Sequence, residues 1–447
     1  MNKHRQMVEE NYAKQRSTIN GIWVFIPIWF GQLVSVIGSG VTAFALGIWV
    51  YQQTGSVTNL ALTSLSATLP SVIISPIAGV FVDRWNRKWI MLISDLIAGL
   101  TTGLLALILF VGNLEIWHIY LVTAVHSICT TFQEPAYMTA MTLLVPKQHL
   151  ARVNGLLYLG ESMTRMICPM LAGVLIASVK IQGIILFDLA TFVFALITLL
   201  YIRFPKPKIA DHANVMGKSS LLIEVADGWR YIKAKPGILG LIVLTAVTNF
   251  IFGTVGVLSI PLVISFASVT VVGILTSISG SGMLFGSLTV SIWGGSQRSI
   301  NNLFCFMLLN GLCLAFIGLK SNVWLVGVAA FIFFFGLPII NSSINVILQR
   351  KVMANVQGRV FALTAMISKS CLPLAYLVAG SLADNVFKPL MAPSGPLAGS
   401  LGQIIGVGPG RGIGLMFIVM GMLTMIAAIL AYQYRPLRLV EKDLPDI

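Results

Sequence analysis

The chain has 447 residues, of which 57% are hydrophobic and only 10% charged, with a formal net charge of +14 at pH 7. A soluble domain could not bury that much apolar surface, so this composition excludes a soluble globular protein and indicates lipid as the natural solvent.

The first 21 residues are polar and basic and are predicted to form a cytoplasmic N-terminal tail. The apolar run after them is too long for a signal-peptide core, so it is predicted to be the first permanent membrane helix. Runs of about 20 apolar residues recur after it and mark transmembrane helices. Long apolar runs such as Ile184 to Ile202 exclude the alternating pattern of a barrel strand. The twelve predicted segments are 22–50, 57–82, 89–112, 117–144, 153–178, 183–203, 237–266, 270–295, 302–319, 323–348, 359–386 and 412–434.

Two longer connections divide these segments. Residues 204–236 form a polar, basic linker, predicted to be cytoplasmic, and 387–411 form a Gly/Pro-rich loop. A shift of 207 residues places Arg152 on Arg359 and Gly79 on Gly286, as a duplicated six-helix unit predicts. The predicted parts are therefore a tail (1–21), an N-terminal six-helix bundle (22–203), the linker (204–236), a C-terminal six-helix bundle (237–434) and a cytoplasmic tail (435–447).

The distribution of Lys and Arg predicts the orientation of these segments. With the N-terminus in the cytoplasm, 23 of the 29 basic residues lie on the cytoplasmic side and four outside. This split follows the positive-inside rule. It accounts for the positive net charge as a topology signal, so nucleic-acid binding need not be invoked.

A charged turn lies between the second and third segments, where Gly79 is followed by Asp83, Arg84, Arg87 and Lys88. This G-x-x-x-D-R-x-x-R-K pattern resembles the signature loop of the major facilitator superfamily of transporters. The resemblance implies an all-α integral membrane fold of twelve helices, built as two six-helix bundles with pseudo-twofold symmetry. It also implies a cytoplasmic gate in which Asp83 meets the start of the eleventh helix and Arg84 pairs with Asp95.

The chain further resembles the macrolide-efflux branch of the twelve-helix drug:proton antiporters. The stretches that carry this resemblance are Phe132 to Ala136, Leu144 to Pro146, Arg152 to Asn154, Gln357 to Phe361, Ala379 to Asp384 and Gly402 to Gly412. The Gly-rich, GP-containing fifth helix common in such antiporters survives only in fragments, at Gly160, Cys168, Pro169 and Gly173. The resemblance implies a monomeric transporter of the bacterial inner membrane that binds a small molecule and protons.

Placing an ionisable side chain inside a membrane segment costs free energy, so each such residue is a candidate for a function. Glu134 lies about ten residues from the cytoplasmic end of the fourth segment, roughly 15 Å deep at 1.5 Å per residue. His126 and Thr130 precede it at spacings that place all three on one helix face. Glu134 is predicted to carry the proton, and the alternative is a structural carboxylate that caps or pairs with a neighbour.

Three further ionisable residues are candidates for proton coupling. Glu161 and Arg165 are spaced i, i+4, so they can pair along the fifth segment, either structurally or as a charge relay. Lys369 is expected to be buried near mid-membrane, where it would lose its charge or find an acidic partner such as Glu161 or Glu134. Asp188 and Asp384 are expected near the outer ends of their helices, within reach of solvent, and receive little functional weight.

Polar residues on the predicted cavity-lining helices could contact substrate or join helices by hydrogen bonds. Beyond His126 and Thr130 they are Gln32, Ser35, Asn249, Asn341 and Asn345. The five cysteines are dispersed through apolar runs and are expected to be buried as small hydrophobic residues, which argues against disulfides and against a metal site. The Gly-rich run from Gly406 lacks the strand and Gly-Lys-Ser/Thr of a phosphate loop, so no nucleotide or other cofactor is expected. No catalytic constellation is present, so an enzyme is not expected.

The sequence thus predicts a secondary active exporter of amphipathic organic compounds, macrolide-like drugs among them, in exchange for protons. Three alternatives remain open. The chain could export a siderophore or metabolite, import a nutrient on the same fold, or act as a membrane receptor or scaffold without transport. Flux in inverted vesicles separates the directions, and the receptor predicts no flux.

Overall fold

The computed structural model describes residues 2–112, 114–144, 150–201, 229–293 and 299–443. Within these ranges it describes only the backbone of some helical residues, which are 2–25, 76, 79–80, 83–84, 139–144, 150–159, 161, 293, 354–355, 358, 362 and 442.

The described chain consists of helices and connecting turns, without a strand. The long helices are α1 (Asn2–Thr54), α2 (Val57–Arg84), α3 (Arg87–Val111), α4 (Ile116–Leu144), α5 (Leu150–Tyr201), α7 (Pro236–Ile264), α8 (Val269–Trp293), α9 (Ser299–Leu319), α10 (Val323–Lys351), α11 (Ala354–Leu382) and α14 (Arg411–Gln433). The short ones are η3 (Ala383–Phe387), α12 (Lys388–Leu390), α13 (Leu401–Ile405), α15 (Arg435–Arg438) and α16 (Val440–Asp443). The prediction of an all-helical membrane fold is confirmed.

Ten stretches of the described helices are long and apolar enough to cross a bilayer. One of them, 162–201 on α5, contains a break at Lys180, whose φ of 58° is left-handed. The predicted fifth and sixth segments meet at this break. Helix α4 has 29 residues but is not among the ten stretches. Twelve spans are reached only if α5 is counted as two spans divided at Lys180 and α4 is counted as one more.

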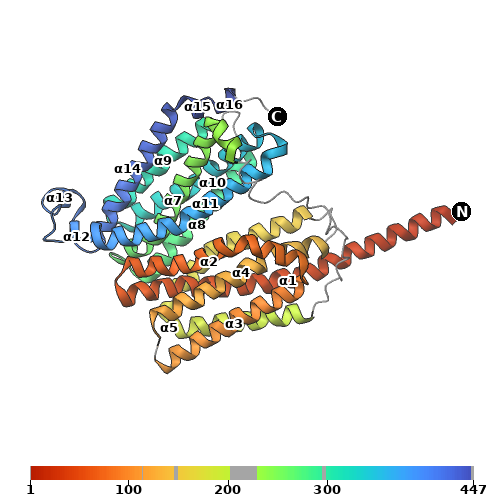
Figure 1. Ribbon diagram of the computed structural model, residues 1–447. Coiled ribbons are helices and arrows are strands. Elements are labelled where there is room, and N and C mark those ends of the chain that lie inside the picture. Colours follow the sequence, from red (N-terminus) through yellow and green to blue (C-terminus); the bar gives the residue numbers. More distant parts are fainter. Residues whose placement is uncertain (1, 113, 145–149, 202–228, 294–298, 444–447) are drawn as a thin grey trace. The chain divides into compact units, whose positions relative to one another are not determined.

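The chain folds into two compact units, which we describe separately. Unit 1 comprises Met1–Leu46 and Ser66–Ala210, and unit 2 comprises Gly47–Leu65 and Asp211–Ile447. In unit 1, α3 packs against α4 and α5 (Figure 1). Helix α1 approaches α5 closely at Gly38, where a Cβ atom would clash with the hydroxyl of Thr191. Glycine is required there because the two helices leave no room for a side chain.

In unit 2, α10 packs against both α8 and α9, α14 packs against α9, and α7 packs against α11 and α14. Helices α9 and α14 run side by side in Figure 1 and meet through paired glycines. A Cβ atom on Gly311 would lie 2.8 Å from the carbonyl oxygen of Gly421, and Gly318 faces Gly414 in the same way. Small residues at such contacts let helix backbones approach closely, as is typical within membranes.

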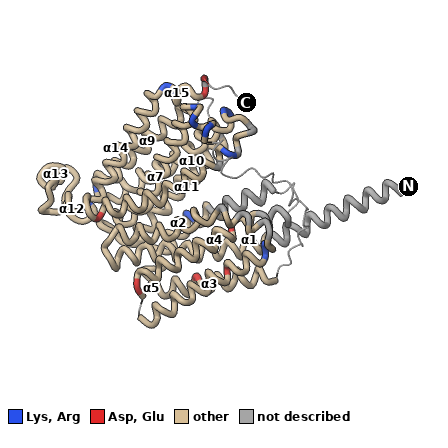
Figure 2. The backbone as a smooth tube through the Cα atoms, viewed as in Figure 1, with Lys and Arg blue, Asp and Glu red and all other residues tan. Residues whose placement is uncertain are grey.

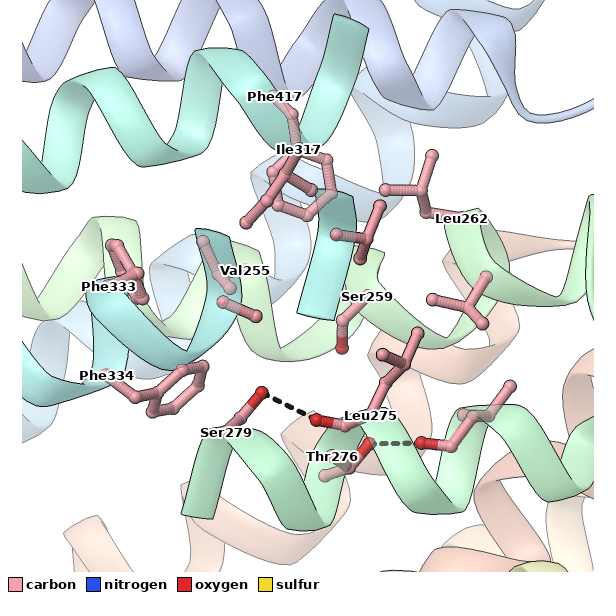
Figure 3. A pocket seen from close by; sticks show the side chains of 14 residues that line it. Val255, Ser259, Leu262, Leu275, Thr276, Ser279, Ile317, Phe333, Phe334 and Phe417 are labelled. Carbon is pink, nitrogen blue, oxygen red and sulfur yellow. Dashed lines mark hydrogen bonds between the residues drawn. The ribbon is translucent and has the colours of Figure 1, made fainter. Parts of the chain in front are cut away.

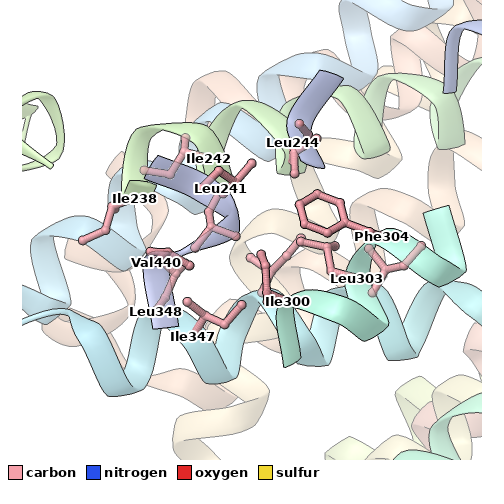
Figure 4. Packing of buried hydrophobic residues seen from close by; sticks show 14 of the residues in the cluster. Ile238, Leu241, Ile242, Leu244, Ile300, Leu303, Phe304, Ile347, Leu348 and Val440 are labelled. Atoms are coloured by element: carbon pink, nitrogen blue, oxygen red, sulfur yellow. The ribbon is translucent and has the colours of Figure 1, made fainter. Parts of the chain in front are cut away.

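A core of buried aliphatic residues closes one end of unit 2 (Figure 4). It joins the start of α7, the start of α9 and the end of α10, with Leu241, Ile300 and Leu348 among its members. Leu437 and Val440, from α15 and α16, complete it. Figure 2 shows Lys and Arg gathered around α15 and the C-terminal end of this unit. The predicted C-terminal tail is therefore folded onto the helices as far as Asp443.

Contacts of Glu441 on α16 strengthen this end of unit 2. Its carboxylate accepts hydrogen bonds from the backbone N–H groups of Ser299 at 2.9 Å and Ile300 at 3.4 Å. These are the first residues of α9, where a negative charge is favoured by the helix dipole. The Nζ of Lys351, a buried residue, donates to the backbone oxygen of Glu441 at 2.6 Å.

The five cysteines are all free. Cys129, Cys168 and Cys313 are buried, as predicted for small hydrophobic residues, and Cys371 is half-buried. Cys305 is exposed, so the expectation of a wholly buried set is wrong for this position. In a membrane helix an exposed cysteine side chain contacts lipid at little cost, because the thiol behaves as a small hydrophobe.

Candidate functional site

A closed network of three polar side chains joins α1, α3 and α4 within unit 1. The amide Nε2 of Gln32 donates to Asp95 Oδ2 at 3.1 Å, and that of Gln133 donates to Asp95 Oδ1 at 2.6 Å. Gln133 Nε2 also lies 3.0 Å from Gln32 Oε1, to which it donates. Each carboxylate oxygen of Asp95 therefore has an amide donor.

This network is buried, with Asp95 4% and Gln32 8% exposed. A carboxylate taken out of water is costly unless hydrogen bonds replace its hydration, and the two amides provide them. Asp95 was predicted to pair with Arg84 at the cytoplasmic gate. Its observed partners are the two glutamines, and the side chain of Arg84 lies outside the described residues. Asp95 lies two turns into α3, where it faces α1 and α4 because the helices pack on that side.

Glu134 follows Gln133 on α4 and lies on an exposed face of the helix, as does Thr130. His126 does not share this face. Its Nε2 lies 3.0 Å from the hydroxyl of Thr102 and 3.1 Å from the carbonyl oxygen of Ala98, both on α3. The prediction of one face for these three residues therefore fails at His126. Each step of four residues rotates the side-chain direction by about 40° around the helix axis. Over the two steps from His126 to Glu134 this rotation is enough to place the two side chains on different faces.

Asp188, on α5, is 0% exposed, so the expectation that solvent reaches it is wrong. The hydroxyl of Ser39 on α1 donates to Asp188 Oδ1 at 3.2 Å. The close approach of α1 and α5 at Gly38 encloses the carboxyl group, whose Oδ1 would lie 3.0 Å from a Cβ at that position.

Asp384 is partly buried and caps the start of α2 within unit 2. Its Oδ2 accepts hydrogen bonds from the backbone N–H of Thr58 at 2.7 Å and from the hydroxyl of Ser56 at 2.8 Å. Its Oδ1 accepts from the N–H of Val57 at 3.1 Å and from Nζ of Lys388 at 2.6 Å. Solvent still reaches this carboxylate in part, as expected, because its side chain is 17% exposed. Its hydrogen bonds show that it acts as a helix cap.

The predicted cavity residues of unit 2 lie on two helices. Asn249 on α7 is half-buried, and its Nδ2 donates to the carbonyl oxygen of Thr245 at 2.9 Å. Asn341 and Asn345 are exposed on α10. Lys369 is exposed on α11, so it does not lie in the buried setting that was predicted.

A small open pocket, with a cavity volume of about 60 Å³, lies among α7, α8, α9, α10 and α14 of unit 2 (Figure 3). Phe333, Phe334 and Phe417 contribute aromatic walls. The hydroxyls of Thr276 and Ser279 donate to backbone oxygens of their own helix, at 2.8 and 2.9 Å. With these hydroxyls satisfied, the pocket offers an apolar surface suited to an apolar group.

The predicted gate is described only in part. Gly79, Asp83 and Arg84 are described by their backbone alone, near the end of α2. The side chain of Asn86 accepts from the N–H of Lys88 at 3.0 Å and so caps α3. Lys88 Nζ donates to the carbonyl oxygen of Leu200 at 3.2 Å, which ties the start of α3 to the end of α5.

Of the remaining predicted site residues, some have side chains that the structure describes and others do not. Arg87, in the first turn of α3, is half-buried, and its Nε is buried without a hydrogen-bond partner among the described residues. Ser35 is buried on α1. Arg165 is exposed on α5, and the side chain of Glu161 lies outside the described residues. The predicted Glu161–Arg165 pair thus stays a prediction.

Sequence reasoning missed Gln133 and undervalued Asp188. Gln133 lies beside Glu134 in the stretch Phe132 to Ala136, which was singled out only for its resemblance. Asp188 is an acidic residue within an otherwise apolar run, and that position alone marks an ionisable group as functional by default. Its hydrogen-bond partner Ser39 carried no comparable signal, because hydroxyl residues are common in membrane helices.

Known proteins share the sequence pattern and the fold of this chain. The family model described as "Major Facilitator Superfamily" matches residues 28–375. Macrolide efflux protein A of Streptococcus pyogenes is 28% identical over 81% of this chain and 90% of its own length. The multidrug efflux pump Tap of Mycolicibacterium fortuitum is 21% identical over 80% of this chain and 88% of its own. A crystal structure of the nucleoside transporter NupG has a TM-score of 0.69 at 12% identity, covering 92% of this chain and 99% of that one.

Proposed function

Because the chain belongs to the Major Facilitator Superfamily of membrane transporters, we propose that it exports amphipathic organic compounds of the macrolide type in exchange for protons. The observation that carries this proposal is the match to Macrolide efflux protein A along most of both chains. The match to a multidrug efflux pump supports the same direction of transport and a broader class of bulky organic substrates.

The side chains of unit 1 support a role for protons. Glu134 is exposed on α4, next in sequence to the buried network of Asp95, Gln32 and Gln133. A carboxyl group inside a membrane segment can bind and release a proton when its surroundings change between two conformations. We propose that Glu134 is this group, with Glu161 and Arg165 of the same unit and Lys369 of unit 2 as further residues of proton coupling.

The substrate is proposed to be held mainly through apolar contacts. The pocket of unit 2 offers aromatic walls from Phe333, Phe334 and Phe417. Asn341 and Asn345, exposed on α10 of the same unit, would supply polar contacts. Thr130, exposed on α4 of unit 1, is proposed separately as a substrate contact of that unit. A few polar groups in an apolar lining are typical of sites that bind drug-sized organic molecules.

In this proposal the chain works as a monomer in the bacterial inner membrane, with both termini in the cytoplasm. The gathering of Lys and Arg around α15 in unit 2 supports a cytoplasmic location for that end (Figure 2). Asp83, Arg84, Arg87 and Lys88 would stabilise one state of an alternating-access cycle, with Gly79 preceding them in the signature loop.

Drug-panel susceptibility of an efflux-deficient bacterial host tests this function. The host would express either the wild-type chain or the Glu134→Gln variant, with membrane levels matched by immunoblot. We expect raised resistance to macrolides or other bulky amphipathic drugs, lost in the variant. Resistance retained in full by the variant would contradict the role of Glu134. No resistance to any drug, with the protein in the membrane, would contradict drug export and favour a siderophore, a metabolite or import.

A further inference from the structure

The carboxyl group of Asp188 lies at the crossing of α1 and α5 and takes no part in the transport scheme above. It is 0% exposed, eight residues past the break at Lys180. Ser39 donates to its Oδ1 at 3.2 Å, and Thr42, one turn further along α1, lies beside the same carboxyl group. Gly38 allows this approach, because any side chain there would meet Thr191.

The hydrogen bonding at this crossing is incomplete. Asp188 Oδ2 and Thr42 Oγ1 are both buried, and neither makes a hydrogen bond of acceptable geometry to a described residue. Thr191 does not supply a donor to Asp188 Oδ2, because its hydroxyl donates to the backbone oxygen of Asp188 at 2.7 Å. A buried carboxylate oxygen without a donor is unfavourable, and a buried unpaired negative charge more so.

No positive charge compensates Asp188 among the described residues around it. Three titratable side chains on the neighbouring elements make hydrogen bonds to other groups. Cys168, which precedes the break at Lys180 in α5, donates to the backbone oxygen of Ile37. His126 on α4 contacts α3, and Asp95 on α3 is bonded to the two glutamines. The surroundings of Asp188 are thus hydroxyl groups and apolar side chains, which suit a neutral carboxyl group.

A proton on Asp188 Oδ2 satisfies both unpartnered atoms at once. The new O–H bond removes the negative charge of the carboxylate, and its hydrogen can point to Thr42 Oγ1, which accepts it. We propose that Asp188, together with Ser39 and Thr42, forms a proton-binding site that is separate from Glu134 and is loaded when α1 and α5 are packed closely.

Release of this proton requires α1 and α5 to separate at Gly38. The ionised carboxylate needs water or donors, and the closed crossing provides only the hydroxyl of Ser39 at Oδ1. Loading and release are therefore tied to the distance between α1 and α5. The part of this inference that links the site to drug export rests on the proposed function, whereas proton binding itself does not.

Infrared titration of the full-length protein in liposomes tests the site, with the proton as the ligand. At neutral pH we expect a protonated-carboxyl C=O band that disappears in Asp188→Asn, an isosteric change. Asp443→Asn, at an exposed carboxylate, is the matched control and should leave the band unchanged. A spectrum in which Asp188→Asn removes no such band would overturn the proposal.

Two milder variants keep the test valid if Asp188→Asn does not assemble. Thr42→Val removes the expected acceptor of the carboxyl proton, and Ser39→Ala removes the donor to Oδ1. Both should shift the C=O band to higher frequency, because each weakens hydrogen bonding to the carboxyl group. An unshifted band in both variants would show that the protonated group lies elsewhere and would overturn the proposal.

Drug efflux in inverted vesicles separates this inference from the proposed function. If the wild-type chain moves drug against its gradient, Asp188→Asn should abolish the dependence of transport on the proton gradient. Proton-driven transport that persists in Asp188→Asn would overturn the link between this site and coupling. If the wild-type chain moves no drug while the infrared band behaves as expected, the proposed function fails and the proton site stands.

Discussion

The amide of Gln133 on α4 donates to the carboxylate of Asp95 on α3 across 2.6 Å. The same amide also lies within hydrogen-bond distance of Gln32 on α1, so one side chain links three helices. Glu134, the next residue on α4, is exposed, so the helix carries a hydrogen-bonded amide and an exposed carboxyl group side by side in sequence.

Gln133→Leu removes both hydrogen bonds of this amide while keeping a similar volume. It leaves Asp95 Oδ1 without its amide donor inside a buried site, so we expect unfolding to become easier by about 1–2 kcal/mol. Thermal unfolding in detergent, followed by helical circular dichroism, measures the change. Gln403→Leu alters an exposed glutamine and should have little effect. Equal melting temperatures for the two variants would show that the network contributes nothing.

Gly38→Ala tests the closeness of α1 and α5. The added Cβ meets the hydroxyl of Thr191, so we expect a destabilisation of about 1–3 kcal/mol from overpacking. Gly256→Ala on α7 is the control, because a Cβ there has no heavy atom within 4 Å. It should be neutral or stabilise its helix by up to about 1 kcal/mol. A Gly38→Ala protein as stable as the wild type would mean that the two helices are not held as described.

Asp384→Ala removes the cap of α2. The N–H groups of Val57 and Thr58 lose their acceptor, and Lys388 loses its ion pair of 2.6 Å. We expect a loss of about 1–2 kcal/mol, the usual size for an N-terminal cap. Asp384→Asn retains one oxygen acceptor and should lie between the alanine variant and the wild type. Thermal unfolding of the three proteins gives the order, and an order in which the asparagine variant is the least stable would contradict the capping role.

Truncation after Tyr434 removes α15 and α16 from unit 2. It uncovers the core around Leu241 and Leu348 and deletes Leu437 and Val440, each worth about 1.5–3 kcal/mol when buried. It also removes the cap that Glu441 provides to α9. We expect a drop in melting temperature and a lower yield of folded protein. A point variant, Glu441→Gln, should show only a small part of this effect. If truncation is harmless, the packing of the tail is not a stabilising feature.

The helical architecture was predictable from the sequence because long apolar runs leave lipid as their only suitable solvent. The break within α5 was also predictable, since the predicted fifth segment ends before Lys180 and the predicted sixth begins after it. The family was predictable from the charged turn after Gly79, whose residues stand out in a chain with so few charges.

The arrangement of the polar groups was less predictable. Periodicity placed His126 with Glu134, yet packing turns His126 towards Thr102 on α3. The position of Asp188 near its helix end indicated solvent, yet Gly38 brings α1 over it. Such contacts depend on which helices adjoin and at what rotation, and a single sequence does not specify these within runs of similar apolar residues.

Proton movement coupled to drug transport in proteoliposomes tests the central claim most directly. Purified protein would be reconstituted with a pH-sensitive dye inside the vesicles, and a macrolide added outside. The account predicts dye-reported proton movement opposite to the drug in the wild-type chain, and none in Glu134→Gln. Macrolide transport without proton movement, or unaltered proton movement in Glu134→Gln, would contradict it.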